Sequence, residues 1–358
     1  MHMADALISP AVGGTLWGVT SGTIAWCSKK VKAAGDERLI PMMGVLGAFI
    51  FTAQMINFSV PGTGSSGHLG GGLILTILLG PYAAFLVIAS VLTVQSLFFA
   101  DGGLLALGCN IFNMGIFPAF IAYPLIYRPI ARGGGATRAW LAAILAAVAG
   151  LQMGAFAVVL ETKASGISAL AFSTFCMLMQ PIHLAIGIVE GLATATVVGF
   201  VSSARPEALA ATLGIPGSAK RLRPVIWGLL IAAIVIGGTL SWFASSRPDG
   251  LEWAIEKVTG RRELAGPKDD VHQLTARLQE NTAILPDYGF KTVGKAKLLA
   301  SQSKPAQNTD REGTSPSRTR PWPAANAGTS LSGVLGGFIT LIVCGLIGCV
   351  LKLRRRVI

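Results

Sequence analysis

The chain has 358 residues, of which 52% are hydrophobic, only 13% are charged and 44 are glycine. Soluble domains carry about 25% charged residues, so this balance excludes an ordinary soluble protein and predicts an all-α integral membrane protein. The net charge of +12 could suggest a nucleic-acid partner. The basic residues are confined to particular loops between apolar stretches, however, so we expect contact with membrane lipid and not with nucleic acid.

Apolar stretches recur along the chain at a length near the 20 or so helical residues that cross a bilayer. We place nine spans at 11–27, 40–60, 69–80, 82–100, 104–127, 139–160, 171–201, 225–244 and 331–351. The short stretch 69–80 is separated from the next by Gly80-Pro81, because proline begins a helix and stops the one before it.

The spans predict two membrane blocks joined by a linker. Residues 1–203 are expected to form a seven-span bundle, and 204–224 a cytoplasmic linker. Residues 225–358 are expected to form a two-span hairpin that encloses an external polar segment, 245–328. Within it, 300–327 has the composition of a linker, whereas the part around Trp253 could fold locally.

The basic residues set the expected orientation. Lysine and arginine gather in 28–38, 128–138, 202–223 and the carboxyl-terminal tail, which we therefore place in the cytoplasm. The segments 60–68, 101–103 and 161–168 hold only Lys163 and are expected outside. This alternation places the amino terminus outside and the carboxyl terminus inside.

Met1 and His2 can together chelate a metal ion if the terminal amine is unblocked. The amine, the His2 backbone nitrogen and the His2 imidazole close two fused chelate rings and leave one planar position for another donor. Residues 1–10 lack a basic region followed by an apolar core, so we expect no signal peptide and a mature terminus at Met1.

A second histidine, His68, lies in the loop NFSVPGTGSSGHLGG, on the same expected side as the amino terminus. Four nitrogens in a plane suit Ni(II), and Co(II) also accepts nitrogen donors, so donor type does not separate the two metals. Taken singly, His2 could belong to a disordered terminus and His68 could be hydrogen-bonded to backbone. Together they predict a metal site.

Polar side chains near the same end are candidates for ordering these loops. Asp101, Asn110 and Asn113 in DGGLLALGCNIFNMG are unfavourable at membrane depth unless they face the protein interior. Asn110 and Asn113 share a helix face, so they could hold a loop around the metal ligands, or simply join two helices. Asn57 and Ser66 are further candidates.

His183 and Glu190 lie seven residues apart on one face of a span, about 10 Å along its axis. They could relay protons or ligate metal, or make structural hydrogen bonds. One alternative is therefore a secondary cation transporter or channel that uses this pair. Another is a membrane enzyme with an outer metal site, for which Asp101 is the available base. GFKTVGK at 289–295 lacks the Ser or Thr of a phosphate loop, so ATP-driven transport would need another subunit.

Four motifs carry a resemblance to a known family: MHMADALISP, GSSGHLGGG at 64–72, DGGLLALGCNIFNMG at 101–115 and HLAIGIVEGLAT at 183–194. They resemble the CbiM/NikM family, the substrate-binding membrane subunits of energy-coupling factor transporters for cobalt and nickel. The resemblance implies a seven-span core that binds the ion through the Met1 amine, the backbone nitrogen and imidazole of His2, and His68. Met3 and Ala4 replace a common Ile-Pro, which leaves the loop conformation open.

The resemblance also implies a biological setting. The protein would be a transport subunit, not an enzyme, in a prokaryotic inner membrane. Its cargo would be Ni²⁺ or Co²⁺ for cobalamin synthesis or nickel enzymes, with no permanently bound cofactor, and its partners a transmembrane coupling subunit and cytoplasmic ATPases. SSRPDGLEWAIEKV at 245–258 and ILPDYGF at 284–290 resemble the PDGLE-type domain of the accessory subunit NikN or CbiN, so the chain looks like a fusion of two subunits.

Overall fold

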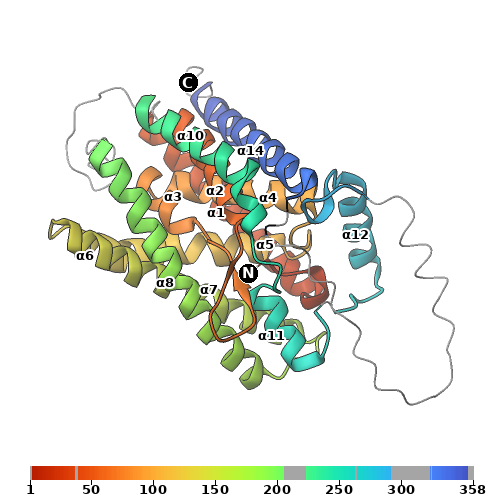
Figure 1. Ribbon diagram of the computed structural model, residues 1–358. Coiled ribbons are helices and arrows are strands. Elements are labelled where there is room, and N and C mark those ends of the chain that lie inside the picture. Colours follow the sequence, from red (N-terminus) through yellow and green to blue (C-terminus); the bar gives the residue numbers. More distant parts are fainter. Residues whose placement is uncertain are drawn as a thin grey trace, which may run out of the picture.

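The computed structural model describes residues 2–36, 39–204, 223–262, 264–291, 323 and 325–353, and this part of the chain is mostly helical (Figure 1). Within these described ranges, five helices are long and apolar enough to cross a membrane by length and composition. They are α4 (Pro81–Phe99), the continuous helix of α5 (Leu107–Ile111), η2 (Phe112–Tyr127) and α6 (Arg128–Ala131), α7 (Ala136–Ser165), α8 (Phe172–Ala204) and α14 (Ala327–Leu353). The expectation of a helical membrane protein is confirmed.

Helices also lie at the other predicted stretches: α1 (Pro10–Ala34), α2 (Leu39–Gln54), α3 (Gly72–Leu79) and α10 (Arg223–Gly238). Helices α2 and α10 have 16 residues each, and α3 has only 8. At a rise of about 1.5 Å per residue, α3 spans about 12 Å, much less than the roughly 30 Å of a bilayer core. The count of seven crossings followed by two therefore stays a prediction.

The expected break between α3 and α4 is confirmed. Helix α3 ends at Leu79, Gly80 takes a φ of 78°, and Pro81 begins α4. Only glycine adopts this backbone conformation without steric strain, and proline at the first helical position needs no amide partner. All residues of α3 are buried, so the short helix packs inside the bundle.

The predicted stretch 40–60 is too long, because α2 ends at Gln54. The chain then forms two short antiparallel strands, β1 (Phe58–Ser59) and β2 (Ser66–Gly67). The sequence predicted an all-α protein and did not indicate these strands. The turn between them contains Gly62 and Gly64, both with positive φ. Pairing across this hairpin satisfies backbone groups that a loop at the edge of the bundle would otherwise leave unpaired.

The carboxyl-terminal block packs onto the bundle. Helices α10 and α14 contact each other and both contact α2. Between them lie η3 (Leu240–Phe243), α11 (Gly250–Thr259), α12 (Asp270–Thr282) and η4 (Pro286–Tyr288), so the part around Trp253 does fold locally. Most of the expected linker 300–327 lies outside the described residues.

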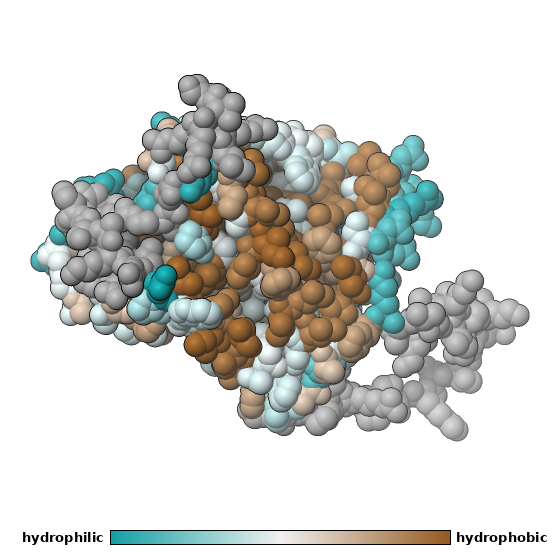
Figure 2. All heavy atoms as spheres, turned by 90° about the horizontal axis from the view of Figure 1, so that it is seen from above, coloured by the Kyte–Doolittle hydropathy of each residue, from teal (hydrophilic) through white to brown (hydrophobic). Residues whose placement is uncertain are grey.

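The outer faces of α10 and α14 are apolar. Trp227, Ile231, Phe338 and Leu346 are each more than half exposed. Figure 2 shows hydrophobic side chains gathered over the face seen from above, the side on which α10 and α14 lie in Figure 1. An exposed apolar surface of this kind is what a lipid-facing helix pair presents.

The segments predicted to be external meet at one end of the molecule, with α12 at the opposite end from α6 (Figure 1). The Ser66 amide donates to the Pro248 carbonyl over 2.7 Å, and the Gln279 side chain donates to the Gly102 carbonyl over 2.7 Å. Helix α11 packs on α8, and α12 on α4. The carboxyl-terminal block therefore sits directly on the loops that carry the expected metal ligands.

Candidate metal-binding site

His2 and His68, which are far apart in sequence, lie together in the structure. Their ring centroids are 5.0 Å apart and their planes differ by 13°. With a metal–nitrogen distance of about 2.0 Å, two imidazoles on one ion have centroids within about 6 Å of each other. The rings are therefore close enough to share one ion. The third expected ligand residue, Met1, lies outside the described residues.

The protonation pattern of His68 suits a metal ligand. Its Nδ1 lies 3.0 Å from the Leu69 carbonyl oxygen. Because a carbonyl only accepts, Nδ1 must carry the proton, which puts the ring lone pair on Nε2. Burial is the main reason that the pKa of His68 falls to about 3, so the imidazole is neutral, the form that binds metals.

His2 is also buried and neutral. Its side chain is 8% exposed, and burial lowers its pKa despite the neighbouring Asp101 carboxylate. Its Nδ1 lies 3.3 Å from Oδ1 of Asp101. Its Nε2 is buried and has no hydrogen-bond partner within the part of the chain that the structure describes. The ring is thus oriented by a carboxylate on its Nδ1 edge.

The backbone next to His2 is fixed by two of the predicted asparagines. Asn110 Oδ1 accepts from the Met3 amide over 2.8 Å, and its Nδ2 donates to the Met3 carbonyl over 3.2 Å. Asn113 Nδ2 contacts the Met3 sulfur at 3.9 Å, and the Gly103 amide donates to the same Met3 carbonyl over 2.9 Å. This helix face therefore holds the amino-terminal segment, as expected of a face that orders a loop. Asn110 bonds to the segment's backbone, and Asn113 contacts a side chain.

The loop that carries His68 is held by Glu190. The Gly70 amide donates to Glu190 Oε2 over 2.8 Å, and the Gly71 amide donates to Oε1 over 3.0 Å. The Gln54 side chain donates to the Gly70 carbonyl over 2.8 Å. Gly71 has a φ of 76°, which other residues adopt only with strain. Glu190 thus sets the path of the backbone two residues after His68.

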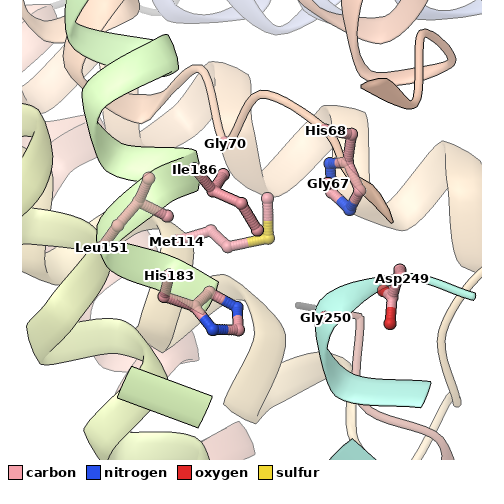
Figure 3. A pocket seen from close by; sticks show the side chains of 9 residues that line it. All are labelled: Gly67, His68, Gly70, Met114, Leu151, His183, Ile186, Asp249 and Gly250. Carbon is pink, nitrogen blue, oxygen red and sulfur yellow. The ribbon is translucent and has the colours of Figure 1, made fainter. Parts of the chain in front are cut away.

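His183 has a different partner from Glu190. Its Nδ1 lies 2.8 Å from the Met179 carbonyl of its own helix. It lines a small cavity of about 10 Å³ together with His68 and Asp249 (Figure 3). Such a volume holds about one water molecule. The two residues of α8 therefore bond to different groups: His183 to the carbonyl of Met179, and Glu190 to the amides at 70 and 71.

Asn57 and Ser66 connect the His68 loop to the carboxyl-terminal block. The Ser66 hydroxyl donates to the Arg247 carbonyl over 2.8 Å. Asn57 contributes its main-chain carbonyl, which accepts from the Ser245 amide over 2.7 Å. Of these two, Ser66 orders the loop through its side chain, and Asn57 does so through its backbone.

Several residues at the site were missed by sequence reasoning. Asp5 accepts from the Ala106 amide and, through its second oxygen, from the Thr275 hydroxyl. Glu161 Oε2 accepts from Asn113 Nδ2 over 2.8 Å. A carboxylate at the end of an apolar span was a usable signal for Glu161, because ionisable groups in spans usually have a specific partner. No local pattern marked Asp5.

A larger cavity, of about 860 Å³, lies over the site between the amino-terminal segment, the loop at 100–103 and helices α11 and α12. His2, His68 and Asp101 are among the residues that line it. Among the described residues, no group of three or more His, Cys, Asp or Glu side chains could hold a metal ion.

Comparison with known families decides the classification. Residues 2–208 match the family model described as CbiM, cobalt uptake substrate-specific transmembrane region. The chain belongs to the CbiM family. Downstream of its CbiM region, residues 223–353 match the PDGLE domain. The resemblance found in the sequence motifs is thereby confirmed for both parts.

Related CbiM-family proteins include fused chains. A fused nickel transport protein NikMN of Rhodobacter capsulatus is 30% identical over 325 residues, which is 83% of this chain and 91% of that protein. A putative fused nickel transport protein NikMN of Archaeoglobus fulgidus is 34% identical over 58% of this chain and 68% of its own length. The cobalt transport protein CbiM of Sorangium cellulosum is 32% identical over 58% of this chain and 94% of its own length.

A solved crystal structure shares the fold of the CbiM region. It is described as a transition metal transporter, is 28% identical, and covers 58% of this chain and 95% of its own chain with a TM-score of 0.52. The chain is therefore a member of a family of membrane transport proteins for transition metals.

Proposed function

We propose that this chain captures Ni²⁺ or Co²⁺ as the substrate-specific component of an energy-coupling factor importer. The observation that carries the proposal is the meeting of His2 and His68, two buried neutral imidazoles 5.0 Å apart, beneath a cavity of about 860 Å³. The relatives named as nickel and cobalt transport proteins support it.

The proposed ligands are the Met1 amine, the main-chain nitrogen and imidazole of His2, and the imidazole of His68. A chelate through the His2 amide nitrogen closes a six-membered ring with Nδ1 of the same residue, whereas Nε2 points away from that ring. His68 would use Nε2, because its Nδ1 faces the Leu69 carbonyl. Four nitrogens in a plane suit Ni²⁺ and also serve Co²⁺, while Mg²⁺ and Ca²⁺ prefer oxygen.

We further propose that the site faces outward in a prokaryotic inner membrane and that a coupling subunit and ATPases complete the importer. Residues 1–203 would form the metal-binding membrane domain, 204–224 a cytoplasmic linker and 225–358 the accessory domain. Support comes from the grouping of basic residues in 28–38 and 128–138, away from the segments that meet at the site.

His183 and Glu190 serve structure in this proposal, not an ion path. Each is buried, and each has its own partner: the Met179 carbonyl for His183 and the loop amides at 70 and 71 for Glu190. Uptake that requires the ATPase subunits fits this view. Metal uptake into vesicles that lack any ATPase subunit would favour the secondary transporter instead.

The terminal amine is tested by comparing the chain with a free Met1 amine to one extended by three residues before Met1. We expect the extension to weaken Ni²⁺ binding by at least 100-fold, because it converts the amine into an amide and removes one donor. The matched control carries the same three residues after Ile358. Unchanged binding after the amino-terminal extension would refute the proposed ligand set.

A further inference from the structure

Tyr288 of η4 is inserted into the end of the CbiM bundle. Its ring stacks on Phe99 at a centroid distance of 5.2 Å and 19°, and lies 6.3 Å from the Phe51 ring. Both Tyr288 and Asp287 have positive φ, at 57° and 51°. Residues other than glycine take this conformation only where the surroundings impose it, and such strain is common at functional sites.

The hydroxyl of Tyr288 reaches the candidate metal site through one carboxylate. It donates to Oδ2 of Asp101 over 2.5 Å, while Oδ1 of Asp101 lies 3.3 Å from Nδ1 of His2. Burial, and then the nearby Asp101 carboxylate, raises the pKa of Tyr288, so the hydroxyl stays a donor. The Asp101 carboxylate thus lies between the Tyr288 hydroxyl and the His2 imidazole.

Chelate geometry makes this contact specific. His2 can bind an ion together with its own amide nitrogen only through Nδ1, because that nitrogen closes a six-membered ring. Asp101 faces this same nitrogen, and a carboxylate only accepts, so Nδ1 carries the ring proton in the metal-free site and releases it when the ion binds. The backbone of the loop is held independently, because the Asp101 amide donates to the Gln95 carbonyl over 3.1 Å and the Gln279 side chain donates to the Gly102 carbonyl over 2.7 Å. The Tyr288 hydroxyl therefore determines the direction of the Asp101 side chain and not the path of the loop.

We propose that Tyr288 is a positioning residue for metal capture: in the metal-free site its hydroxyl holds the Asp101 carboxylate beside Nδ1 of His2, so that the ring is already turned with this nitrogen toward the place where an ion would bind in exchange for the Nδ1 proton. The inference rests on the proposed function. It assigns the PDGLE region a direct part in shaping the ligand set, from a residue 187 positions along the chain from the carboxylate it holds.

The test compares two substitutions at one position. Tyr288→Phe removes only the hydroxyl and keeps the ring against Phe99, whereas Tyr288→Leu also removes the ring. Outer-shell partners of metal ligands typically change metal affinity by about 10- to 100-fold. We expect Tyr288→Phe to weaken Ni²⁺ binding by about 10-fold in calorimetric titration. If Tyr288→Phe binds Ni²⁺ like the wild type and only Tyr288→Leu binds more weakly, the ring contributes packing alone. If Tyr288→Phe binds Ni²⁺ more tightly, the hydroxyl hinders metal binding. Either result overturns the proposal.

Action through Asp101 is tested by a double-mutant cycle. If Tyr288 works by holding Asp101, Tyr288→Phe should have no further effect on Ni²⁺ affinity in an Asp101→Asn background. Additive losses would mean that the hydroxyl acts by another route and would overturn the inference.

A metal-free readout separates this inference from the proposed function. The imidazole nitrogen NMR shifts of His2 in the metal-free chain should change in Tyr288→Phe, because the carboxylate beside Nδ1 loses its fixed direction. Failure of the wild-type chain to bind Ni²⁺ or Co²⁺ would refute the proposed function, while unchanged His2 shifts in Tyr288→Phe would refute the role of Tyr288.

Discussion

The Asn110 side chain makes two hydrogen bonds to the backbone of Met3. Its Oδ1 accepts from the Met3 amide over 2.8 Å, and its Nδ2 donates to the Met3 carbonyl over 3.2 Å. Met3 follows His2 directly, and both Asn110 and Met3 are almost completely buried. The side chain of a membrane-embedded helix thus acts as the fixed point for the segment that carries a proposed metal ligand. Metal affinity should therefore depend on residues that never touch the ion.

Replacing Asn110 tests this dependence. Asn110→Ala leaves the buried Met3 amide without this acceptor, which costs about 1–3 kcal/mol, whereas the Met3 carbonyl still accepts from the Gly103 amide. We expect a lower thermal stability and a Ni²⁺ affinity reduced by 10-fold or more. Asn110→Asp keeps an acceptor for the amide but loses the donor, so it should fall between Ala and the wild type. Wild-type Ni²⁺ affinity in Asn110→Ala would contradict the role of Asn110 in holding the Met3 backbone for metal binding.

Glu190→Gln should weaken metal binding by displacing His68. The Glu190 carboxylate accepts from two amides, at Gly70 and Gly71, whereas a glutamine amide would turn its NH₂ group toward one of them. A loss of about 1–3 kcal/mol in the stability of this loop is expected, with a matching loss of Ni²⁺ affinity.

The control for Glu190→Gln is Thr196→Val on the same helix. The Thr196 hydroxyl is exposed and donates to the Leu192 carbonyl of its own turn. This variant should bind Ni²⁺ like the wild type. If Glu190→Gln also binds like the wild type but stops transport, Glu190 serves an ion path and the positioning role is wrong.

His272 should anchor the PDGLE region to the amino-terminal segment. Its Nε2 lies 3.1 Å from the Asp5 carbonyl and 3.0 Å from the Ile8 carbonyl, and its Nδ1 lies 2.7 Å from Asp269 Oδ2. His272→Ala removes these bonds, so hydrogen–deuterium exchange of residues 5–8 should become faster. The side chain of the neighbouring exposed Gln273 donates to the Lys268 carbonyl, on its own segment, and Gln273→Ala should leave exchange unchanged. Equal exchange in both variants would exclude the anchor.

The start of α12 should respond to acid. Hydrogen bonds from the His272 amide, more than any other influence, hold the pKa of Asp269 below its usual range. A carboxyl group with a lowered pKa in the folded state adds stability that is complete above its unfolded value of about 3.9 and is lost as the pH falls through the lowered value.

Hydrogen–deuterium exchange of residues 270–282, corrected for intrinsic rates, should therefore be constant near neutral pH and rise only below about pH 4. Asp269→Asn keeps a cap acceptor without a titrating carboxyl and should flatten this rise. A rise at the same pH in Asp269→Asn would assign the effect to another group.

Much of the helical fold could be predicted from apolar runs and from Gly80-Pro81, since span length and helix breaking are local properties. The hairpin around β1 and β2 could not, because its backbone pairs depend on contacts with neighbouring segments. The stretch 69–80 was expected to be short, but its buried apolar residues from Leu73 to Leu79 resemble part of a membrane span, so the sequence did not show that α3 has only 8 residues.

The meeting of His2 and His68 was predictable, because it followed from donor types and loop orientation. The part of Met1 in the site stays a prediction, since this residue lies outside the described residues. The roles of Asp5, Glu161 and Tyr288 were not predictable, because their partners lie far along the chain. Glu161 bonds to Asn113, and Asp5 and Asp101 accept from Thr275 and Tyr288 of the PDGLE region. Glu190 was singled out correctly as a buried polar residue, but its partners, the amides at 70 and 71, required the structure.

The most direct test of the central claim is a Ni²⁺ titration of the purified chain, followed by visible absorption, in the wild type and in His68→Ala. We predict one ion per chain with the spectrum of planar, low-spin Ni²⁺ in the wild type, and a loss of both the spectrum and at least 100-fold in affinity in His68→Ala, because a planar nitrogen donor is removed. An octahedral spectrum in the wild type, or wild-type affinity in His68→Ala, would contradict a shared site at His2 and His68.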